Sequence, residues 1–184
     1  MHTIPRIDYA KIVRASTYYA SFGYIERQVP WIVSCDAYKA TKPPFAQDFY
    51  TLGGYLNASG EQSFLQLMFD DEKLTKHFCI TPCFREEERL DAIHYRYFFK
   101  MELIDTDVSQ ENLQAMLRIA KLFFEVYLPV EILQTDKNGE AFDIIDAKHK
   151  IELGSYGIRR HKNFSWIYGT GVALPRLDVV INKQ

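Results

Sequence analysis

Two apolar segments joined by a charged stretch constrain the fold of this chain most. Residues 76–85 (KHFCITPCFR) and 95–104 (YRYFFKMELI) are rich in aromatic and β-branched side chains, which is typical of strands. The connection between them, residues 85–94 (REEERLDAIH), is strongly charged and belongs at the surface. This pattern predicts an antiparallel hairpin and, with it, an antiparallel sheet.

Amphipathic helices are expected on either side of the hairpin. From Asp8 to Phe22, apolar residues recur at steps of three and four, which predicts a helix that Gly23 can terminate. Ser59 is a candidate N-cap for a second helix. Ser109 is a candidate N-cap for a third, whose apolar stripe is the most regular in the chain.

The other segments are short and mostly extended. Residues 24–34 are expected to be extended, and residues 39–48 (KATKPPFAQD) to form a loop. Short strands are expected after residue 129, with Gly169 opening a possible final helix. Because no internal repeat, low-complexity tract or linker interrupts the pattern, residues 1–184 are predicted to form a single α+β domain. Its sheet is expected to be mostly antiparallel and flanked by helices.

Composition narrows the possible partners and location. The net charge of −2 gives no overall positive field for a polynucleotide backbone, although nucleic acid could still bind locally. The three cysteines cannot all pair, and their spacing with the histidines matches no zinc pattern, so reduced thiols are expected. Neither a signal peptide nor a run of about 18 apolar residues is present, which predicts no membrane association and a cytoplasmic protein.

Four residues suggest a site for a nucleoside triphosphate. Activation of a carboxylate by ATP needs cations on the phosphates, an apolar surface for adenine and an acid that holds Mg²⁺. Arg85 and Arg176 offer planar cations, Phe98 an aromatic ring, and Glu152 a carboxylate in an alternating strand. Each has a plainer interpretation alone: a surface ion pair for either arginine, a core position for Phe98 and a solvent-facing position for Glu152. Together they favour the nucleotide site.

Three segments, in order, resemble the motifs of the class II aminoacyl-tRNA synthetase catalytic core. Residues 23–30 (GYIERQVP) resemble motif 1, residues 83–98 (CFREEE to HYRYF) motif 2, and residues 169–177 (GTGVALPRL) motif 3. Two positions depart from motif 3, where Ala173 replaces a glycine and Pro175 an acidic residue. The resemblance covers residues 8–181. It implies the class II fold, ATP and Mg²⁺ as cofactors, and a homodimer formed through motif 1.

The resemblance also implies roles for individual residues. Arg85 would hold the α-phosphate, Glu87 the adenine edge, Phe98 the adenine face and Arg176 the γ-phosphate, with Arg85 and Arg176 acting in catalysis. His94, Gly169 and Gly171 complete the motifs at the ATP site. Glu152 would bind metal and ATP, with Asp143 as a second metal ligand. Two extra residues in the turn between them keep the strand parity that places Asp143 on the correct face.

Two further resemblances indicate the substrate. Residues 151–159 (IELGSYGIR) resemble segments of aspartate–ammonia ligases and of aspartyl- and asparaginyl-tRNA synthetases, in which an arginine reads the substrate side chain. That arginine is Arg159 here. Residues 55–62 (YLNASGEQ) resemble an asparaginyl-tRNA synthetase segment that contacts the amino-acid ammonium, a role for which Glu61 and Gln62 compete. The implied substrate pocket consists of Ser59, Glu61, Gln62, Lys100, Glu102, Ser155 and Arg159.

Three classes of function remain open. The favoured one is activation of aspartate, with asparagine as the near alternative, followed by transfer to ammonia or another small amine. It is favoured over tRNA charging because the catalytic core fills the chain and no anticodon-binding domain is expected. The second is a truncated synthetase that transfers an amino acid to RNA, protein or a carrier. The third is a non-catalytic dimeric paralogue. Residues 91–98 (DAIHYRYF) also resemble the phenylalanyl- and pyrrolysyl-type branch.

Overall fold

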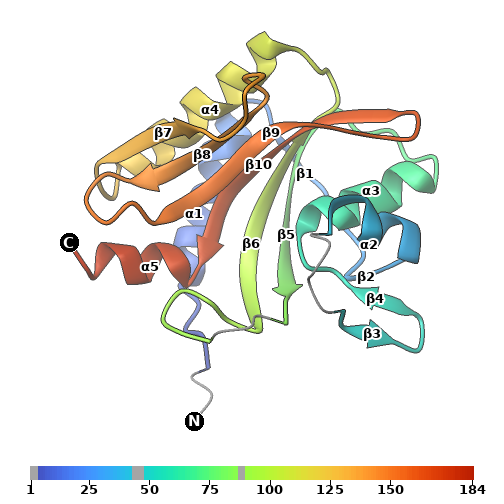
Figure 1. Cartoon of the computed structure of the whole chain (residues 1–184), viewed down its shortest axis with the longest axis horizontal. Coiled ribbons are helices and arrows are strands. Elements are labelled where there is room, and N and C mark those ends of the chain that lie inside the picture. The colour runs from blue at the N-terminus through green and yellow to red at the C-terminus, as the bar shows by residue number, and fades with distance from the viewer. Residues whose placement is uncertain (1–3, 43–47, 87–89) are drawn as a thin grey trace.

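A large twisted sheet organises the molecule. The computed structural model describes residues 4–42, 48–86 and 90–184. Within this part of the chain, seven strands form one sheet in the order β1-β5-β6-β10-β9-β8-β7, and three short strands form a second sheet in the order β2-β4-β3 (Figure 1). The strands are β1 (Ile25–Glu26), β2 (Ile32–Val33), β3 (Tyr50–Thr51), β4 (Gly54–Leu56), β5 (Lys76–Phe84), β6 (Tyr97–Asp105), β7 (Val130–Gln134), β8 (Ala141–Asp146), β9 (Glu152–His161) and β10 (Phe164–Leu174).

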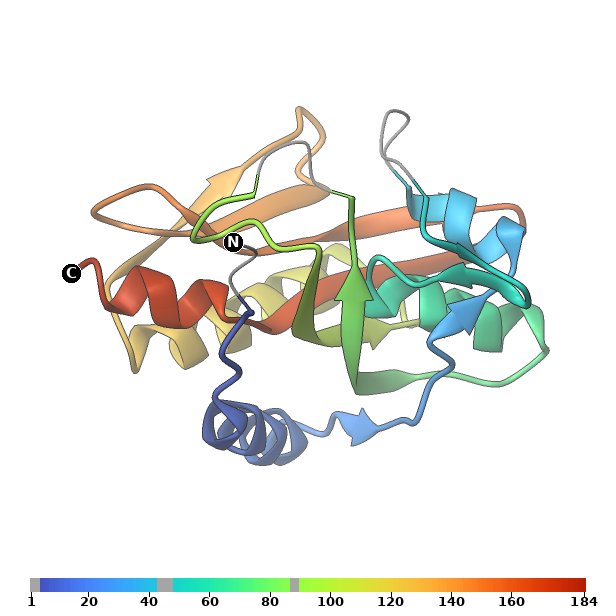
Figure 2. The same cartoon turned by 90° about the horizontal axis from the view of Figure 1, so that it is seen from below.

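Helices lie on both faces of the large sheet. They are α1 (Tyr9–Ser21), α2 (Cys35–Thr41), α3 (Gly60–Phe69), α4 (Gln110–Glu125) and α5 (Arg176–Ile181). One core forms where α1 and α4 pack on one face, which Figure 2 shows below the sheet. A second core forms where α2 and α3 pack on the opposite face, over one end of β5, β6 and β10. The rest of that second face carries the pocket described below.

The predicted hairpin and the antiparallel sheet are confirmed. β5 and β6 pair antiparallel from Lys76 opposite Asp105 to Phe84 opposite Tyr97. All other pairings in the large sheet are also antiparallel except that of β1 with β5. The α+β class is therefore as expected, with one short parallel strand at the edge.

The caps predicted for two helices are also confirmed. The Ser59 hydroxyl accepts a hydrogen bond from the backbone N–H of Glu61 at the start of α3. The Ser109 hydroxyl accepts one from Asn112 at 3.0 Å at the start of α4. These bonds satisfy N–H groups that a helix leaves unpaired in its first turn, so the sequence signal has a direct structural cause.

Two expectations about secondary structure are wrong. Residues 35–41 form α2, capped by the Ser34 hydroxyl, although they were expected to join an extended segment to a loop. The final helix begins at Arg176 and not at Gly169, because β10 continues to Leu174. Gly169 pairs with Leu103 of β6 on one side and Tyr156 of β9 on the other, so both neighbours hold it in the sheet.

The cysteines are free thiols, as expected. Cys79 and Cys83 lie buried in β5, and Cys35 is half-buried in α2. Burial raises the pKa of the Cys83 thiol to about 12 and that of Cys79 well above its ordinary value. Both buried thiols are therefore protonated and unreactive at neutral pH. In the part of the chain described, no helix has the length and apolar character needed to cross a membrane.

Candidate active site

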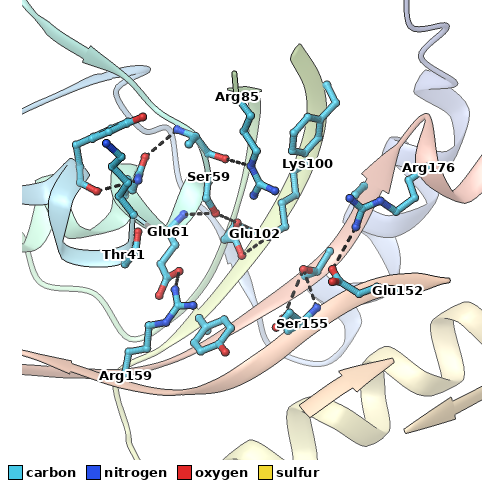
Figure 3. Close-up of a pocket in the computed structure, with 18 of the residues that line it drawn as sticks. Thr41, Ser59, Glu61, Arg85, Lys100, Glu102, Glu152, Ser155, Arg159 and Arg176 are labelled. Atoms are coloured by element: carbon cyan, nitrogen blue, oxygen red, sulfur yellow. Dashed lines mark hydrogen bonds and ion pairs between the residues drawn. The ribbon is translucent and has the colours of Figure 1, made fainter. Parts of the chain in front are cut away.

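A polar pocket of about 340 Å³ opens on the sheet face opposite α1 and α4. Its floor comes from β6, β9 and β10, and its walls come from α2, the start of α3 and the first residue of α5 (Figure 3). The volume lies at the low end of the range of about 300–1,000 Å³ typical of ligand sites. Its lining includes many of the residues selected from the sequence, namely Arg85, Phe98, Glu152, Arg176, Ser59, Glu61, Gln62, Lys100, Glu102, Ser155 and Arg159.

Arg85 and Phe98 stand together at one end of the pocket. Arg85 follows β5 directly, and its Nε donates to the carbonyl of Ala58 at 2.9 Å. Its guanidinium carbon lies 5.0 Å from the centre of the Phe98 ring. Among the described residues, the Nε bond is the hydrogen bond that holds this side chain, and its terminal nitrogens carry N–H groups that can donate to an anion. A fixed cation beside an aromatic face is therefore present, as predicted.

Arg176 and Glu152 form an ion pair across the mouth of the pocket. Arg176 Nη1 donates to Glu152 Oε1 at 3.2 Å, and 46% of the Glu152 side chain is exposed. A bulge brings Glu152 to this face: Ile144 of β8 pairs with Gly154, but the next residue, Ile145, pairs with Glu152. An incoming phosphate or metal ion would therefore meet a cation and a carboxylate that are already neighbours.

Lys100, Glu102 and Ser59 form a connected group on the pocket floor. Lys100 and Glu102 alternate along β6, so both side chains leave the same face of the sheet. The Lys100 ammonium lies 2.9 Å from the Glu102 carboxylate, whose side chain is only 1% exposed. The Ser59 hydroxyl donates to Oε2 of the same carboxylate. The positions predicted from strand parity are thus confirmed, and the two charges balance.

Glu61 and Arg159 form a second ion pair, deeper in the wall. Arg159 Nη1 contacts Glu61 Oε2, and Trp166 Nε1 donates to Glu61 Oε1 at 2.7 Å. The Arg159 guanidinium lies 4.1 Å above the Tyr168 ring. Burial raises the pKa of the Glu61 carboxyl, and the Arg159 charge opposes that effect. Neighbouring Arg160 instead makes two hydrogen bonds to half-buried Glu140, outside the pocket.

Gln62 and Ser155 both line the pocket, but the polar atoms of Gln62 are already used in hydrogen bonds to backbone. Both polar atoms of the buried Gln62 side chain bond to backbone, the oxygen to Ala58 N–H at 2.7 Å and the nitrogen to Tyr38 carbonyl at 3.0 Å. Glu61 is thus the better placed of the two competitors for a contact with substrate. Ser155 lines the pocket from β9, where its backbone bonds to the Thr170 hydroxyl.

Asp143 and Glu152 are suited to a divalent cation that is shared with a phosphate. Asp143 pairs directly with Ser155 across β8 and β9, so it is on the pocket side of the sheet, as strand parity predicted. Burial and then the negative charge of Glu152 raise the Asp143 pKa, while a hydrogen bond with Ser155 opposes them, and Asp143 itself is not among the described residues that line the pocket. Mg²⁺ commonly takes one or two carboxylates plus phosphate oxygens and water. No group of three potential ligands occurs among the described residues, so the fit requires the phosphate.

Four residues predicted at the ATP site are elsewhere or cannot be placed. Gly169 and Gly171 are not among the described residues that line the pocket. A Cβ on Gly169 would approach Met116 Sδ of α4 to 2.5 Å, and one on Gly171 would approach Met101, so packing on the helical face explains both glycines. His94 bonds to Asp91 at 2.9 Å in the loop before β6 and does not line the pocket. Glu87 lies outside the described residues.

Sequence reasoning missed several pocket residues. Tyr168 and Thr170 alternate with Gly169 along β10, and with Trp166 they form one face of that strand. Their period of two in the sequence is the signal that predicts a common face for these side chains. Tyr38 and Lys42 enter the pocket from α2 and its end, a helix that the sequence did not predict.

Comparisons with known proteins identify the fold. The chain superposes on a pyrrolysyl-tRNA synthetase from Desulfitobacterium hafniense with a TM-score of 0.73 and 18% identity, covering 95% of this chain and 69% of that one. For the seryl-tRNA synthetase of Pyrococcus horikoshii, solved with ATP, the TM-score is 0.74 and the identity 14%, with coverages of 94% and 49%. For the cytoplasmic serine-tRNA ligase of Naegleria fowleri, solved with AMP, the TM-score is 0.71 and the identity 16%, with coverages of 91% and 46%.

The sequence itself matches a shorter stretch of a relative. The chain is 31% identical over 123 residues to the serine–tRNA ligase of Methylococcus capsulatus, in an alignment that covers 56% of this chain and 29% of that protein. No family profile matches the chain. The chain therefore spans less than a third of that relative and about half of the two seryl enzymes of known structure.

These findings confirm the class II synthetase fold and leave the finer prediction without support. The structures matched are class II catalytic cores. The predicted closeness to aspartate–ammonia ligases and aspartate-type synthetases is not shown, since the matches named above are seryl and pyrrolysyl enzymes.

Proposed function

From the premise that this chain has the fold of a class II aminoacyl-tRNA synthetase catalytic core, we propose that it activates an amino acid with ATP. In this reaction a carboxylate oxygen of the amino acid attacks the α-phosphorus. The bond from that phosphorus to the β,γ-phosphates breaks, and the products are an aminoacyl adenylate and pyrophosphate. The observation that carries the proposal is the convergence of Arg85, Phe98, Glu152 and Arg176 on one pocket, from segments that lie up to 91 positions apart (176 − 85 = 91).

The cations are placed to bind the triphosphate at two points. Arg85 stands beside the Phe98 ring, so a base stacked on the ring would leave its α-phosphate within reach of the guanidinium. Arg176 lies at the pocket mouth, where it would meet the far end of the triphosphate. Two seryl relatives of the same fold were solved with ATP or AMP, which supports this choice of nucleotide.

Glu152 and Asp143 would hold Mg²⁺ together with phosphate oxygens. The ion would supply positive charge that offsets the negative charge developing on the pyrophosphate leaving group. The pairing of β8 with β9 directs both carboxylates to the pocket side of the sheet, and the charge of Glu152 raises the pKa of Asp143. Such an arrangement is costly without a cation and therefore suits one.

The floor and wall beyond the phosphate site would take the amino acid. Ser59, Glu61, Lys100 and Glu102 offer hydrogen-bond donors and carboxylates there, and an amino acid requires both for its own carboxylate and ammonium. The N–H groups of Lys100 that do not face Glu102 can donate to the carboxylate of the amino acid, while Glu61 or Glu102 can accept hydrogen bonds from its ammonium. The pocket thereby places the two reactants side by side, which is the main requirement of adenylate formation.

Two acceptors are candidates for the activated amino acid. Transfer to ammonia or another small amine was predicted from residues 151–159. Transfer to RNA, protein or a carrier is favoured by the tRNA ligases that the chain resembles. Incubation of the protein with ATP and a labelled amino acid, with either ammonium or total tRNA added, separates the two by the product that carries the label.

We also propose that two copies pair through the motif 1 segment. Trp31 is 53% exposed and Ile25 is 60% exposed in this segment, which is unusual for large apolar side chains unless another surface covers them. Sedimentation at micromolar concentration should give twice the monomer mass. A monomer at that concentration would contradict the proposal.

Trapping of the adenylate tests the proposed reaction. Hydroxylamine converts an activated acyl group to a hydroxamate, so formation of hydroxamate that depends on both ATP and an amino acid reports activation. Arg85→Ala should lower the rate at least tenfold, because it removes a charge-assisted contact worth about 1.5–3 kcal/mol. Arg160→Ala is the matched control, since Arg160 binds only surface Glu140. If no amino acid gives hydroxamate, or if both variants lose activity equally, the proposal is wrong.

A further inference from the structure

The buried Glu61–Arg159 ion pair is positioned to select the substrate side chain. The Glu61 side chain is 5% exposed, and both of its oxygens accept hydrogen bonds, one from Arg159 and one from Trp166. The Arg159 side chain is 38% exposed and rests on the Tyr168 ring, so part of the guanidinium edge still faces the pocket (Figure 3). The pair is thus rigidly held and yet partly accessible.

The amino-acid end of the pocket carries no excess charge. Glu61 balances Arg159, and Glu102 balances Lys100, with 1% and 12% exposure for the side chains of that second pair. The zwitterionic backbone of an amino acid adds no net charge. An acidic side chain would add one negative charge for which the described residues offer no unpaired cation at this end other than Arg85, which is assigned to the α-phosphate, and it would meet Glu61 as a like charge.

An uncharged polar side chain is complementary to the same pair. Arg159 can donate a further N–H, and each Glu61 oxygen has a lone pair left after its one hydrogen bond. A hydroxyl or an amide can accept from the arginine and donate to the carboxylate at once. A carboxylate can only accept hydrogen bonds, so it would face the Glu61 carboxylate without a donor. An ammonium can only donate, so it would face the Arg159 guanidinium without an acceptor.

We infer that the Glu61–Arg159 pair makes this pocket select an amino acid with an uncharged hydroxyl or amide side chain and reject an acidic one. The inference rests on the proposed amino-acid activation and names its substrate class. It departs from the aspartate preference expected in the sequence analysis, where Arg159 was considered without its counter-ion. Glu61 is the specificity-determining residue, because without its charge Arg159 would be free for a carboxylate.

Binding of stable adenylate mimics tests this selection directly. Asparaginyl and aspartyl sulfamoyl-adenosine differ by one charge and have nearly the same shape, and the seryl compound adds a smaller uncharged side chain. Calorimetry on the unaltered protein should show that the better of the two uncharged compounds binds at least tenfold more tightly than the aspartyl compound. Aspartyl binding that equals or exceeds the better uncharged one overturns the inference. If none of the three compounds and no ATP binds, the proposed function itself fails.

A matched pair of variants assigns the selection to Glu61. Glu61→Gln removes the charge and keeps one carbonyl oxygen, which can accept from Trp166 or from Arg159 but not from both as they stand, because those donors contact different oxygens of Glu61. It should shift the ratio of uncharged to aspartyl affinity at least tenfold towards aspartyl. Glu140→Gln makes the same change on Glu140, the partner of Arg160 outside the pocket, and should leave the ratio unchanged. An unchanged ratio in a folded Glu61→Gln protein contradicts the role of Glu61. Should that variant not fold, the comparison of the three compounds on the unaltered protein still decides the inference.

Discussion

Replacement of Arg176 by alanine isolates the contact expected at the far end of the triphosphate. In the structure, Arg176 is 21% exposed and pairs with Glu152 at 3.2 Å. With Glu152 nearly half exposed, this ion pair adds less than about 1 kcal/mol to the free energy of unfolding. Arg176 is also the first residue of α5, where a cation is unfavourable to the helix dipole, so its loss should leave stability almost unchanged.

The effect on ATP binding should be much larger. A hydrogen bond between guanidinium and phosphate contributes about 1.5–3 kcal/mol. Release of Arg176 from Glu152 offsets less than about 1 kcal/mol of this. About 0.5–3 kcal/mol therefore remains, and because about 1.4 kcal/mol equals a factor of ten, the Kd for Mg·ATP should rise roughly two- to 150-fold.

Calorimetric titration of Mg·ATP measures this change, and urea denaturation measures stability in the same samples. Arg160→Ala is the control, because it removes an arginine that pairs with Glu140 outside the pocket. An Arg176→Ala protein that binds ATP as tightly as the parent would refute the assignment of Arg176 to the phosphates. Equal losses of affinity in both variants would instead indicate a general charge effect.

Three further predictions concern packing, thiols and protonation. Gly169→Ala should lower the free energy of unfolding, measured by urea denaturation, by about 1–3 kcal/mol, because the added Cβ would lie 2.5 Å from Met116 Sδ. Gly53→Ala is the control and should have little effect, because its Cβ would have nothing within 4 Å. Iodoacetamide should label only half-buried Cys35 in the folded protein, and modification of either buried cysteine would contradict the described burial. Since burial raises the pKa of Glu61 above 4.5, its contribution to stability is fully present below that pH and is lost as the pH rises through the folded pKa. The unfolding free energy of Glu61→Gln relative to the parent should therefore increase between about pH 4 and pH 7, and a constant difference would contradict the raised pKa.

Local patterns in the sequence predicted the elements with strong periodicity. The β5–β6 hairpin and the α4 helix follow from alternation and from a stripe of apolar residues, which are properties of short segments. Strand parity along β6 also placed Lys100 and Glu102 on one face correctly. Helix α2 was missed because its seven residues contain only two buried ones, too few to show a helical period.

Contacts between distant segments could not be predicted in this way. Glu61 and Arg159 are 98 positions apart, so the counter-ion that changes the role of Arg159 has no local signal. Gly169 was expected to serve ATP or a helix, but its small size is required by Met116 of α4, a neighbour that only the packed structure shows. The motif positions that do line the pocket, such as Arg85 and Arg176, were found through their resemblance to a family and not through periodicity.

Pyrophosphate exchange tests the central claim most directly, because it requires an amino acid, ATP and the reversible formation of an adenylate at one site. The unaltered protein, incubated with Mg·ATP, labelled pyrophosphate and each of the common amino acids in turn, should incorporate label into ATP with an amino acid whose side chain is an uncharged hydroxyl or amide. Absence of exchange with every amino acid, in protein shown to be folded, would contradict the account of this chain as an amino-acid-activating enzyme.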